Sequence, residues 1–288
     1  MQRNKEKIHE IDVDKAWNIV YTRLEKDILL AEDTDLSSRR KLFKYVRWAA
    51  VATAAACIGL IISNVYFPKD KDDTLIFLQN KDNSGALVTT FEDGSTVYLA
   101  NNASIFYPDC FAKNKRKVEL RGNALFYVTK DEKRPFIVET KENITIEVVG
   151  TIFAVQSTSG TPFELSVKEG KVNIHSKDNK NVVPLVAGET VRMESSGLNK
   201  SETVNFSVFN YFTERMCFKD EKLNNIINAI NSMYGFPNLT TDESINDRLL
   251  TVTFENESVE SMTELICMAL NLEYVNKQDT IYIRKFIK

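Results

Sequence analysis

The run TTFEDGSTVYL, residues 89–99, decides the fold class of the largest part of this chain. Asp93 and Gly94 lie between two runs in which apolar and polar residues alternate, and a period of two is typical of a half-buried strand. Asp-Gly is a preferred pair for a tight hairpin turn, because both residues tolerate a positive φ. The run therefore predicts two antiparallel strands that are joined by a turn at Asp93-Gly94.

The same alternation extends over residues 72–197, where no helical periodicity interrupts it. FELSVKEGKVNIH repeats the hairpin pattern around Glu169-Gly170, and further strand-like runs are RKVELRGNALFYVTK, RPFIVETKENITIEVVG and TIFAVQS. Gly122 and Gly150 interrupt these runs and are expected to form bends or bulges. Residues 72–197 are therefore predicted to form one all-β domain.

Residues 214–288 have a different pattern, which predicts a small α+β domain, and the polar residues 198–213 are expected to form a linker. FKDEKLNNIINAINSMYG has apolar residues at helical spacing, with Asp220 placed to cap the helix. LLTVTFE alternates as a strand, Ser258 begins a second helix, and LEYVN and TIYIRK are short strands. The predicted order is strand, helix, strand, strand, helix, strand, strand.

The segment RWAAVATAAACIGLIISNVYFP carries no charge from Trp48 to Phe67. A helix of this length is roughly 30 Å long, which matches the hydrocarbon thickness of a bilayer. Residues 48–67 are therefore predicted to be a single transmembrane helix, retained as a signal anchor because residues 1–47 precede it. The alternatives are a buried soluble helix and lipidation at Cys57.

Basic residues are concentrated before this predicted span, and they predict its orientation. The group before the span consists of Arg39, Arg40, Lys41, Lys44 and Arg47. After the span, Lys69 and Lys71 are accompanied by acidic residues. The N-terminus is therefore expected to lie in the cytoplasm, and the two predicted domains are expected to lie outside it.

The segment before the span contains an amphipathic stripe, which predicts a helix between Asp12 and Leu30. Its apolar members are Val13, Ala16, Trp17, Val20, Tyr21, Leu24 and Ile28. A segment this short cannot build its own core, so the stripe needs another surface. Charges of both signs on the polar face favour a protein groove over the lipid interface. The juxtamembrane helix and a weakly structured tail remain alternatives.

Cysteines and histidines form no motif that would indicate catalysis or metal binding. The chain has four cysteines and two histidines, without a C-x-x-C pair, an H-E-x-x-H motif or a glycine-rich phosphate loop. Cys217 and Cys267 either form a disulfide or remain buried thiols, and the second interpretation is favoured. The net charge of −3 provides no basic stripe for nucleic acid. We therefore expect no enzyme, no cofactor, no metal and no direct contact with nucleic acid.

Several runs together resemble the FecR-type transmembrane anti-sigma factors of Bacteroides-like bacteria. They are EDGSTVYLANNASIFYP, then RKVELRGNALFYVTKDEKRPFIVETKENITIEVVGTIFAVQS, then KEGKVNI and VAGETV. Asn123 and Ala154 replace the Glu and Asn that are usual in the family, without disturbing the alternation. The resemblance implies that residues 72–197 are a periplasmic FecR domain. Residues 214–288 look like the signalling domains at the N-termini of secretins and TonB-dependent transporters.

The resemblance implies a signal relay across the inner membrane. A TonB-dependent outer-membrane transporter would engage the periplasmic part, and the cytoplasmic tail, residues 1–47, would control an extracytoplasmic-function sigma factor and thereby transcription of nutrient-uptake genes. Expected sigma-factor contacts are Trp17, Val20, Tyr21 and Leu24. Many relatives have a longer tail, so inhibition, activation or both remain open.

Two further expectations concern the path of the signal. Ile281, Tyr282 and Ile283 in TIYIRK are predicted to lie at a sheet edge and to bind the transporter's signalling domain by strand pairing. A single span offers little packing that could carry a conformational change, so cleavage by an intramembrane protease near residues 49–56 is predicted. The alternative function is a membrane-anchored periplasmic structural or glycan-binding module, which exposed aromatic platforms on the β-domain would favour.

Overall fold

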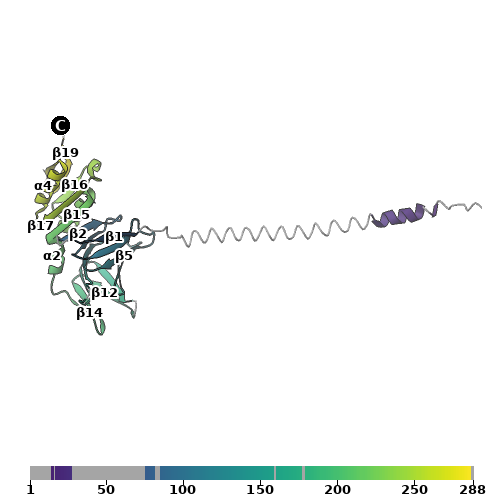
Figure 1. The fold of residues 1–288 in the computed structure, drawn as a ribbon, viewed down its shortest axis with the longest axis horizontal. Helices are drawn as coiled ribbons and strands as arrows, with labels where there is room; N and C mark the ends of the chain where they lie inside the picture. The colour runs from purple at the N-terminus through teal and green to yellow at the C-terminus, as the bar shows by residue number, and fades with distance from the viewer. Residues whose placement is uncertain are drawn as a thin grey trace, which may run out of the picture. The chain divides into compact units, whose positions relative to one another are not determined.

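A computed structural model of the chain describes residues 14–15, 17–27, 75–81, 85–158, 160–176 and 179–286. The chain divides into two compact units, Met1–Lys71 and Asp72–Lys288. In the first unit, residues 14–15 and 17–27 are α-helical, which confirms the helix predicted there (Figure 1). The predicted span, residues 48–67, lies outside the described residues. Within the described ranges, every helix is too short or too polar to cross a bilayer.

Two large sheets build the second unit in the part of the chain that the structure describes (Figure 1). The seven-stranded sheet has the order β1 (Leu75–Gln79), β4 (Ser104–Pro108), β5 (Arg116–Arg121), β7 (Phe136–Thr140), β8 (Ile144–Val148), β11 (Lys171–Ser176) and β12 (Asn179–Val186). The nine-stranded sheet has the order β14 (Gly197–Glu202), β13 (Glu189–Glu194), β10 (Glu164–Glu169), β9 (Ile152–Gln156), β6 (Ala124–Tyr127), β3 (Thr96–Leu99), β2 (Ala86–Thr90), β15 (Arg215–Lys222) and β17 (Leu249–Glu255). The described fold is therefore rich in β-structure, as the alternation predicts.

The two sheets share a hydrophobic core. Val97 and Phe126 from the nine-stranded sheet are in the same buried cluster as Ile105 and Val118 from the seven-stranded sheet. Their neighbours along the strands point the other way, because side chains alternate between the two faces of a sheet. Strands β3 and β6 are buried on both faces, because Tyr98 and Leu125 pack in a second buried cluster, whereas β7 and β8 alternate buried and half-buried residues.

A buried ion pair fixes the first hairpin turn within this core. The Arg116 guanidinium contacts the Asp93 carboxylate at 2.6 Å, and the two side chains are 0% and 3% exposed. Arg116 also donates to the backbone carbonyls of Arg134 at 2.8 Å and Thr129 at 2.9 Å. Asp93 accepts from the Ser95 amide at 3.0 Å and from its hydroxyl at 2.7 Å. The two charges are therefore held by several hydrogen bonds, which a buried pair requires.

One of the two predicted hairpins is present and the other is not. Strands β2 and β3 pair antiparallel around the turn at Asp93-Gly94, which confirms that prediction. At Glu169-Gly170 the chain instead passes from β10 in one sheet to β11 in the other, so a hairpin there is wrong. Gly170 has φ +88°, and an added Cβ would lie 2.7 Å from a backbone oxygen of Gly150. The glycine permits a tight crossing between sheets, which has the same local sequence pattern as a hairpin turn.

The C-terminal elements follow the predicted order. They are β15, α3 (Leu223–Tyr234), β16 (Asn238–Thr241), β17, α4 (Val259–Leu270), β18 (Leu272–Lys277) and β19 (Thr280–Lys285), with a short 3-10 helix at Glu243–Ile245. The Ser258 hydroxyl accepts a hydrogen bond from the Ser261 amide and caps α4 as predicted. Asp220 does not cap α3, because it belongs to β15 with φ +49° and the helix begins at Leu223.

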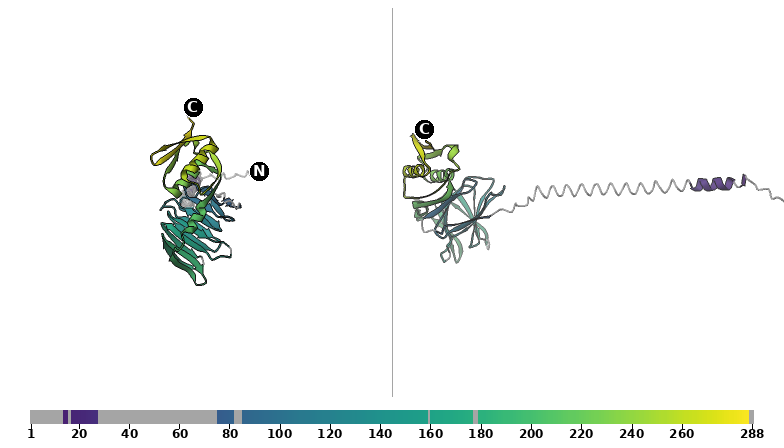
Figure 2. Two further views of the ribbon diagram at one scale, coloured as in Figure 1. Left: turned by 90° about the vertical axis from the view of Figure 1, so that its left-hand side faces the viewer. Right: turned by 45° about the horizontal axis from the view of Figure 1, so that its top comes forward.

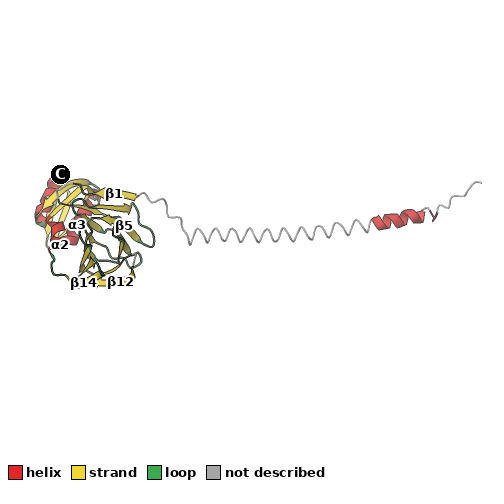
Figure 3. Cartoon of the chain, turned by 60° about the horizontal axis from the view of Figure 1, so that its bottom comes forward, coloured by secondary structure: helices red, strands yellow, loops and turns green. Residues whose placement is uncertain are grey.

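Residues 198–213, predicted to be a linker, form ordered elements instead. They include most of β14 and of helix α2 (Ser207–Glu214), whose Phe209 and Phe212 side chains are 3% and 1% exposed. Strand β15 then pairs parallel with β2, so the C-terminal part extends the nine-stranded sheet. Figure 2 shows the green and yellow C-terminal elements continuing directly from the teal strands, and Figure 3 shows the red helices of the second unit, labelled α2 and α3, beside the yellow strands. The linker prediction is wrong, because Phe209 and Phe212, two aromatic residues within a mostly polar run, pack this segment against the core.

Strand β19 is the central strand of a separate three-stranded sheet. It pairs parallel with β16 and antiparallel with β18, and Ile281 and Ile283 are 3% and 0% exposed. The prediction that TIYIRK lies at a sheet edge is therefore wrong. A strand about 40 residues earlier in the chain takes the side that was expected to be open, and the local sequence contains no sign of that pairing.

Candidate functional site

Two surfaces of the described chain expose apolar side chains in an arrangement suited to binding a partner. One is the apolar stripe of the N-terminal helix, defined by Trp17, Val20, Tyr21 and Leu24. The other is a groove in the C-terminal domain, between helix α4 and strand β18. They belong to different compact units, so each is described by itself.

The apolar stripe follows directly from the helical spacing of its four residues. Positions i, i+3, i+4 and i+7 lie on one face of an α-helix. Trp17, Val20, Tyr21 and Leu24 are 58%, 46%, 70% and 54% exposed. The Trp17 and Tyr21 rings lie 6.3 Å apart between centroids, with 52° between their planes. The structure thus confirms a helix at these positions and shows their side chains open to solvent.

The stripe is suited to inserting into an apolar groove of a partner protein. Aromatic side chains bury a large area, and Trp and Tyr add a hydrogen-bonding group at the edge of the ring. Ile19 is also exposed, at 54%, but it lies on another side of the helix. It provides an internal comparison, because it has similar exposure without belonging to the stripe. The predicted members Val13, Ala16 and Ile28 lie outside the described residues.

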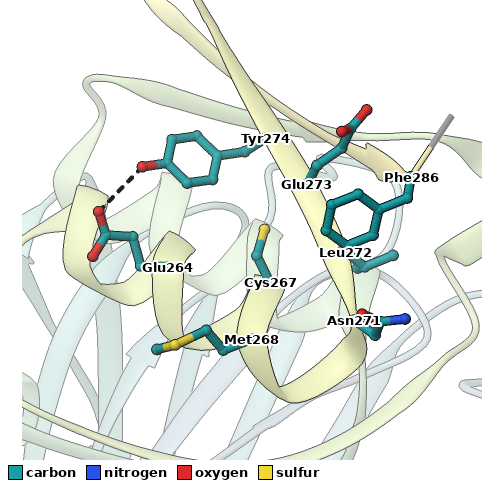
Figure 4. Close-up of a pocket in the computed structure, with 8 residues that line it drawn as sticks. All are labelled: Glu264, Cys267, Met268, Asn271, Leu272, Glu273, Tyr274 and Phe286. Carbon is teal, nitrogen blue, oxygen red and sulfur yellow. Dashed lines mark hydrogen bonds between the residues drawn. The ribbon is translucent and has the colours of Figure 1, made fainter. Parts of the chain in front are cut away.

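The groove is defined by one helix, the neighbouring strand and the residue that follows the last strand (Figure 4). It has a volume of about 570 Å³ and is lined by Glu264, Cys267, Met268, Asn271, Leu272, Glu273, Tyr274 and Phe286. Met268 and Phe286 are 71% and 56% exposed, which is unusual for such large apolar side chains. Both side chains therefore offer contact area to a partner.

Strand β18 adds a backbone edge to the groove. In the described sheet it pairs only with β19, from Leu272 opposite Lys285 to Lys277 opposite Thr280. Its other side presents backbone N–H and C=O groups, which a partner strand can pair with. This edge, together with Met268 and Phe286, combines strand pairing with an apolar anchor point.

Acidic side chains surround this groove and organise its rim. The Tyr274 hydroxyl donates to Glu264 at 3.1 Å, and this hydrogen bond is the largest cause of the raised pKa of Tyr274 (Figure 4). Glu273 accepts from Arg284 at 2.8 Å. Burial raises the pKa of the Cys267 thiol to about 11, so it remains protonated at neutral pH. A protonated thiol is a poor nucleophile, so burial keeps Cys267 weakly reactive.

The predicted transporter contacts are not part of this groove. Ile281 and Ile283 point into the core, and the Tyr282 hydroxyl donates to Asp242. The groove residues were missed because Met268 and Phe286 lie 18 positions apart in the chain and come together only in the fold. One feature of the sequence did indicate this surface: Met268 is a large apolar residue on the face of helix α4 that points away from the core.

Cysteine and metal chemistry add no further site within the described ranges. Cys217 and Cys267 are free thiols, so they form no disulfide with each other in this structure. No three His, Cys, Asp or Glu side chains gather as a metal site in the described residues.

Family comparisons place both parts of the second unit. The FecR protein family matches residues 82–173, and the FecR C-terminal family matches residues 215–283. Together the two matches cover more than half of the chain. An all-β module of this kind, followed by this α+β domain, defines a protein of the FecR type. The chain belongs to the FecR family, which confirms the resemblance seen in the sequence.

Two crystal structures are similar to this chain, and both are of a candidate anti-sigma factor from Parabacteroides distasonis. Each is 24% identical to it and covers 74% of this chain and 100% of the other chain. Their TM-scores are 0.45 and 0.44. The search of curated proteins found no match to the chain.

Proposed function

We propose that this FecR-family chain is an anti-sigma regulator of the inner membrane. In this proposal residues 48–67 span the membrane once, the N-terminal tail binds an extracytoplasmic-function sigma factor in the cytoplasm, and the periplasmic part receives the signal. The observation that carries the proposal is the exposed apolar stripe, Trp17, Val20, Tyr21 and Leu24, in a chain that belongs to this family. The role is regulatory and requires no catalysis by the chain.

The stripe supports a protein partner because of its composition. Four apolar side chains on one face of a short helix expose hydrophobic surface, and burying it against a partner is favourable. The described polar positions include Lys15, Arg23, Glu25, Lys26 and Asp27, which carry both signs of charge. A helix that lies on a membrane surface is typically richer in Lys and Arg on its polar face. The groove of a sigma-factor domain is therefore the partner surface that we propose.

The groove between α4 and β18 is the proposed receptor for the upstream signal. Its partner is the periplasmic signalling domain of a TonB-dependent transporter, which would pair a strand with β18 and insert an apolar side chain between Met268 and Phe286. Strand β18 thus takes the place of Ile281, Tyr282 and Ile283 as the proposed contact, because β19 is enclosed between two strands.

The shared nine-stranded sheet bears on how the signal crosses the membrane. Strand β15 pairs with β2 at Met216, Cys217 and Phe218, and the Phe209 and Phe212 side chains belong to the same buried cluster as Phe218. A hinge at residues 198–213 would require breaking this packing. The second unit is therefore expected to act as one body. This favours transmission by cleavage in or near residues 49–56, by an intramembrane protease, over a rearrangement of domains.

A pull-down of the full-length chain with the sigma factor encoded beside it tests the proposal. Trp17→Ala should weaken binding by more than 2 kcal/mol, about 30-fold, because it removes an exposed aromatic anchor. Ile19→Ala is the matched control, since Ile19 is equally apolar and 54% exposed but lies outside the stripe. Equal binding by wild type and Trp17→Ala would contradict the proposed sigma-factor surface.

A further inference from the structure

Strand β1 and its neighbours carry a third exposed apolar surface, far from the groove in sequence. We call it the β1 patch and define it by Leu75, Phe77, Phe106, Pro108 and Arg121. Leu75 and Phe77 are 64% and 52% exposed. In the register of the sheet, Leu75 lies opposite Pro108 and Phe77 lies opposite Phe106. These residues therefore form neighbouring cross-strand pairs on one face.

Aromatic and cationic groups are packed together in the β1 patch. The Phe77 and Phe106 rings are 4.7 Å apart between centroids. The Arg121 guanidinium carbon lies 4.9 Å from the centroid of the Phe106 ring and the group also pairs with Glu119 at 2.8 Å. This arrangement holds a positive charge over the half-buried Phe106 ring, next to the exposed Phe77 ring.

The packing of the sheet does not account for the exposed side of β1. Ile76 and Leu78 are half-buried, and they alternate with Leu75 and Phe77, which point the other way. A sheet face that meets only water is ordinarily polar. Strand β1 is thus apolar on both faces, and its outer face is suited to an environment other than bulk water.

The position of β1 in the chain indicates which environment this is. Residues 68–74 separate it from the proposed span, and seven extended residues reach at most about 25 Å. Pro108 lies opposite the first residue of β1, so the loop that follows Pro108 leaves the sheet at the same end. Exposed Lys113 and Lys115 lie in that loop, together with exposed Asp109.

We propose that the β1 patch rests on the phospholipid surface of the membrane that anchors the chain. Aromatic side chains favour the headgroup region, where the ring is in an apolar layer and its surroundings are polar. Arg121, Lys113 and Lys115 would face lipid phosphates. A sugar would need an open aromatic face, and Arg121 covers that of Phe106, so the patch is a poor glycan platform. The inference rests on the membrane anchoring in the proposed function.

Fluorescence of the full-length chain in vesicles tests the contact. Trp17→Phe and Trp48→Phe remove both native tryptophans, and Phe77→Trp then reports from the β1 patch. The vesicles contain phosphatidylcholine and phosphatidylglycerol, with or without lipids brominated near the headgroup. We expect the Phe77→Trp emission to shift to the blue and to be quenched by brominated lipid. The Leu249→Trp control, at a position that is 59% exposed in the C-terminal domain, should remain unquenched.

The remaining outcomes separate this inference from the proposed function. If the chain stays in the vesicles after alkaline washing and Phe77→Trp is not quenched, the anchoring stands and the lipid contact is wrong. A blue shift that depends on protein concentration, without quenching, would assign the β1 patch to a second copy of the chain. A chain that washes off the vesicles would overturn both the anchoring and the inference. Lys113→Glu with Lys115→Glu should reduce quenching in these vesicles and should leave it unchanged in vesicles of phosphatidylcholine alone.

Discussion

Replacing Arg116 by methionine should destabilise the second unit strongly, because it removes one charge of a fully buried pair. Methionine fills a similar volume but supplies no positive charge and no hydrogen-bond donor. The Asp93 side chain, 3% exposed, would then keep its carboxylate in the core without its cation. Three carbonyl contacts of the guanidinium, at Arg134, Thr129 and Asp131, would be lost as well.

The expected size follows from these contacts. Removing one partner of a buried ion pair costs about 3–5 kcal/mol, most of it from the charge that is left behind. Asp93 keeps its two hydrogen bonds from Ser95, at 3.0 and 2.7 Å, which offset part of the penalty. We therefore expect a loss near the lower end, about 3 kcal/mol.

The matched control is Arg121→Met, because Arg121 forms an ion pair with Glu119 on the surface. That pair has the same guanidinium–carboxylate chemistry, but its side chains are 54% and 45% exposed. Exposed pairs contribute about 0–1 kcal/mol. Urea unfolding of the full-length chain in detergent, followed by circular dichroism of the β-structure, measures both variants. An Arg116→Met variant as stable as Arg121→Met would refute the reasoning about the buried pair.

Three further predictions test the fold and the groove. Gly170→Ala should lower the free energy of unfolding more than Gly188→Ala. Both glycines have a positive φ, but an added Cβ at Gly170 would lie 2.7 Å from a backbone oxygen, whereas one at Gly188 would have no atom within 4 Å. Phe212→Ala should cost about 3–5 kcal/mol, because the ring is 1% exposed in the core; a loss below 1 kcal/mol would restore the idea of a loose linker. At pH 8, Cys267 should react with a thiol reagent far more slowly than exposed Cys110, since burial raises its pKa to about 11 and little thiolate exists until the pH approaches that value.

The elements of this fold could be predicted from the sequence because their signals are local. Strand β8 alternates buried and half-buried residues from Ile144 to Val148, and that period of two is visible in the sequence itself. The cap of α4 at Ser258 and the turn at Asp93-Gly94 likewise depend on a few adjacent residues. Each of these features depends on residues that are close together in the sequence.

Pairing between distant strands could not be predicted in the same way. Strand β15 pairs with β2, which lies about 130 residues earlier, and β19 is enclosed because β16 pairs with it. Any exposed strand edge could in principle accept either segment, and the choice depends on the packing of the whole unit. The apolar stripe of the N-terminal helix was accessible to sequence reasoning because its spacing is local. The groove could not be predicted, because Met268 and Phe286 come to line the same groove only through the fold.

The position of β15 links the architecture to the proposed signalling. A domain attached by a linker can report a binding event by changing its orientation, but β15 is hydrogen-bonded on both sides, to β2 and to β17. Met216 and Phe218 of this strand are 1% and 0% exposed, so their separation from the β-rich part would expose core. A partner bound at the α4–β18 groove would therefore act on the second unit as a whole. Under the proposed function, the position of this unit would then control the access of the protease to the proposed cleavage region near residues 49–56.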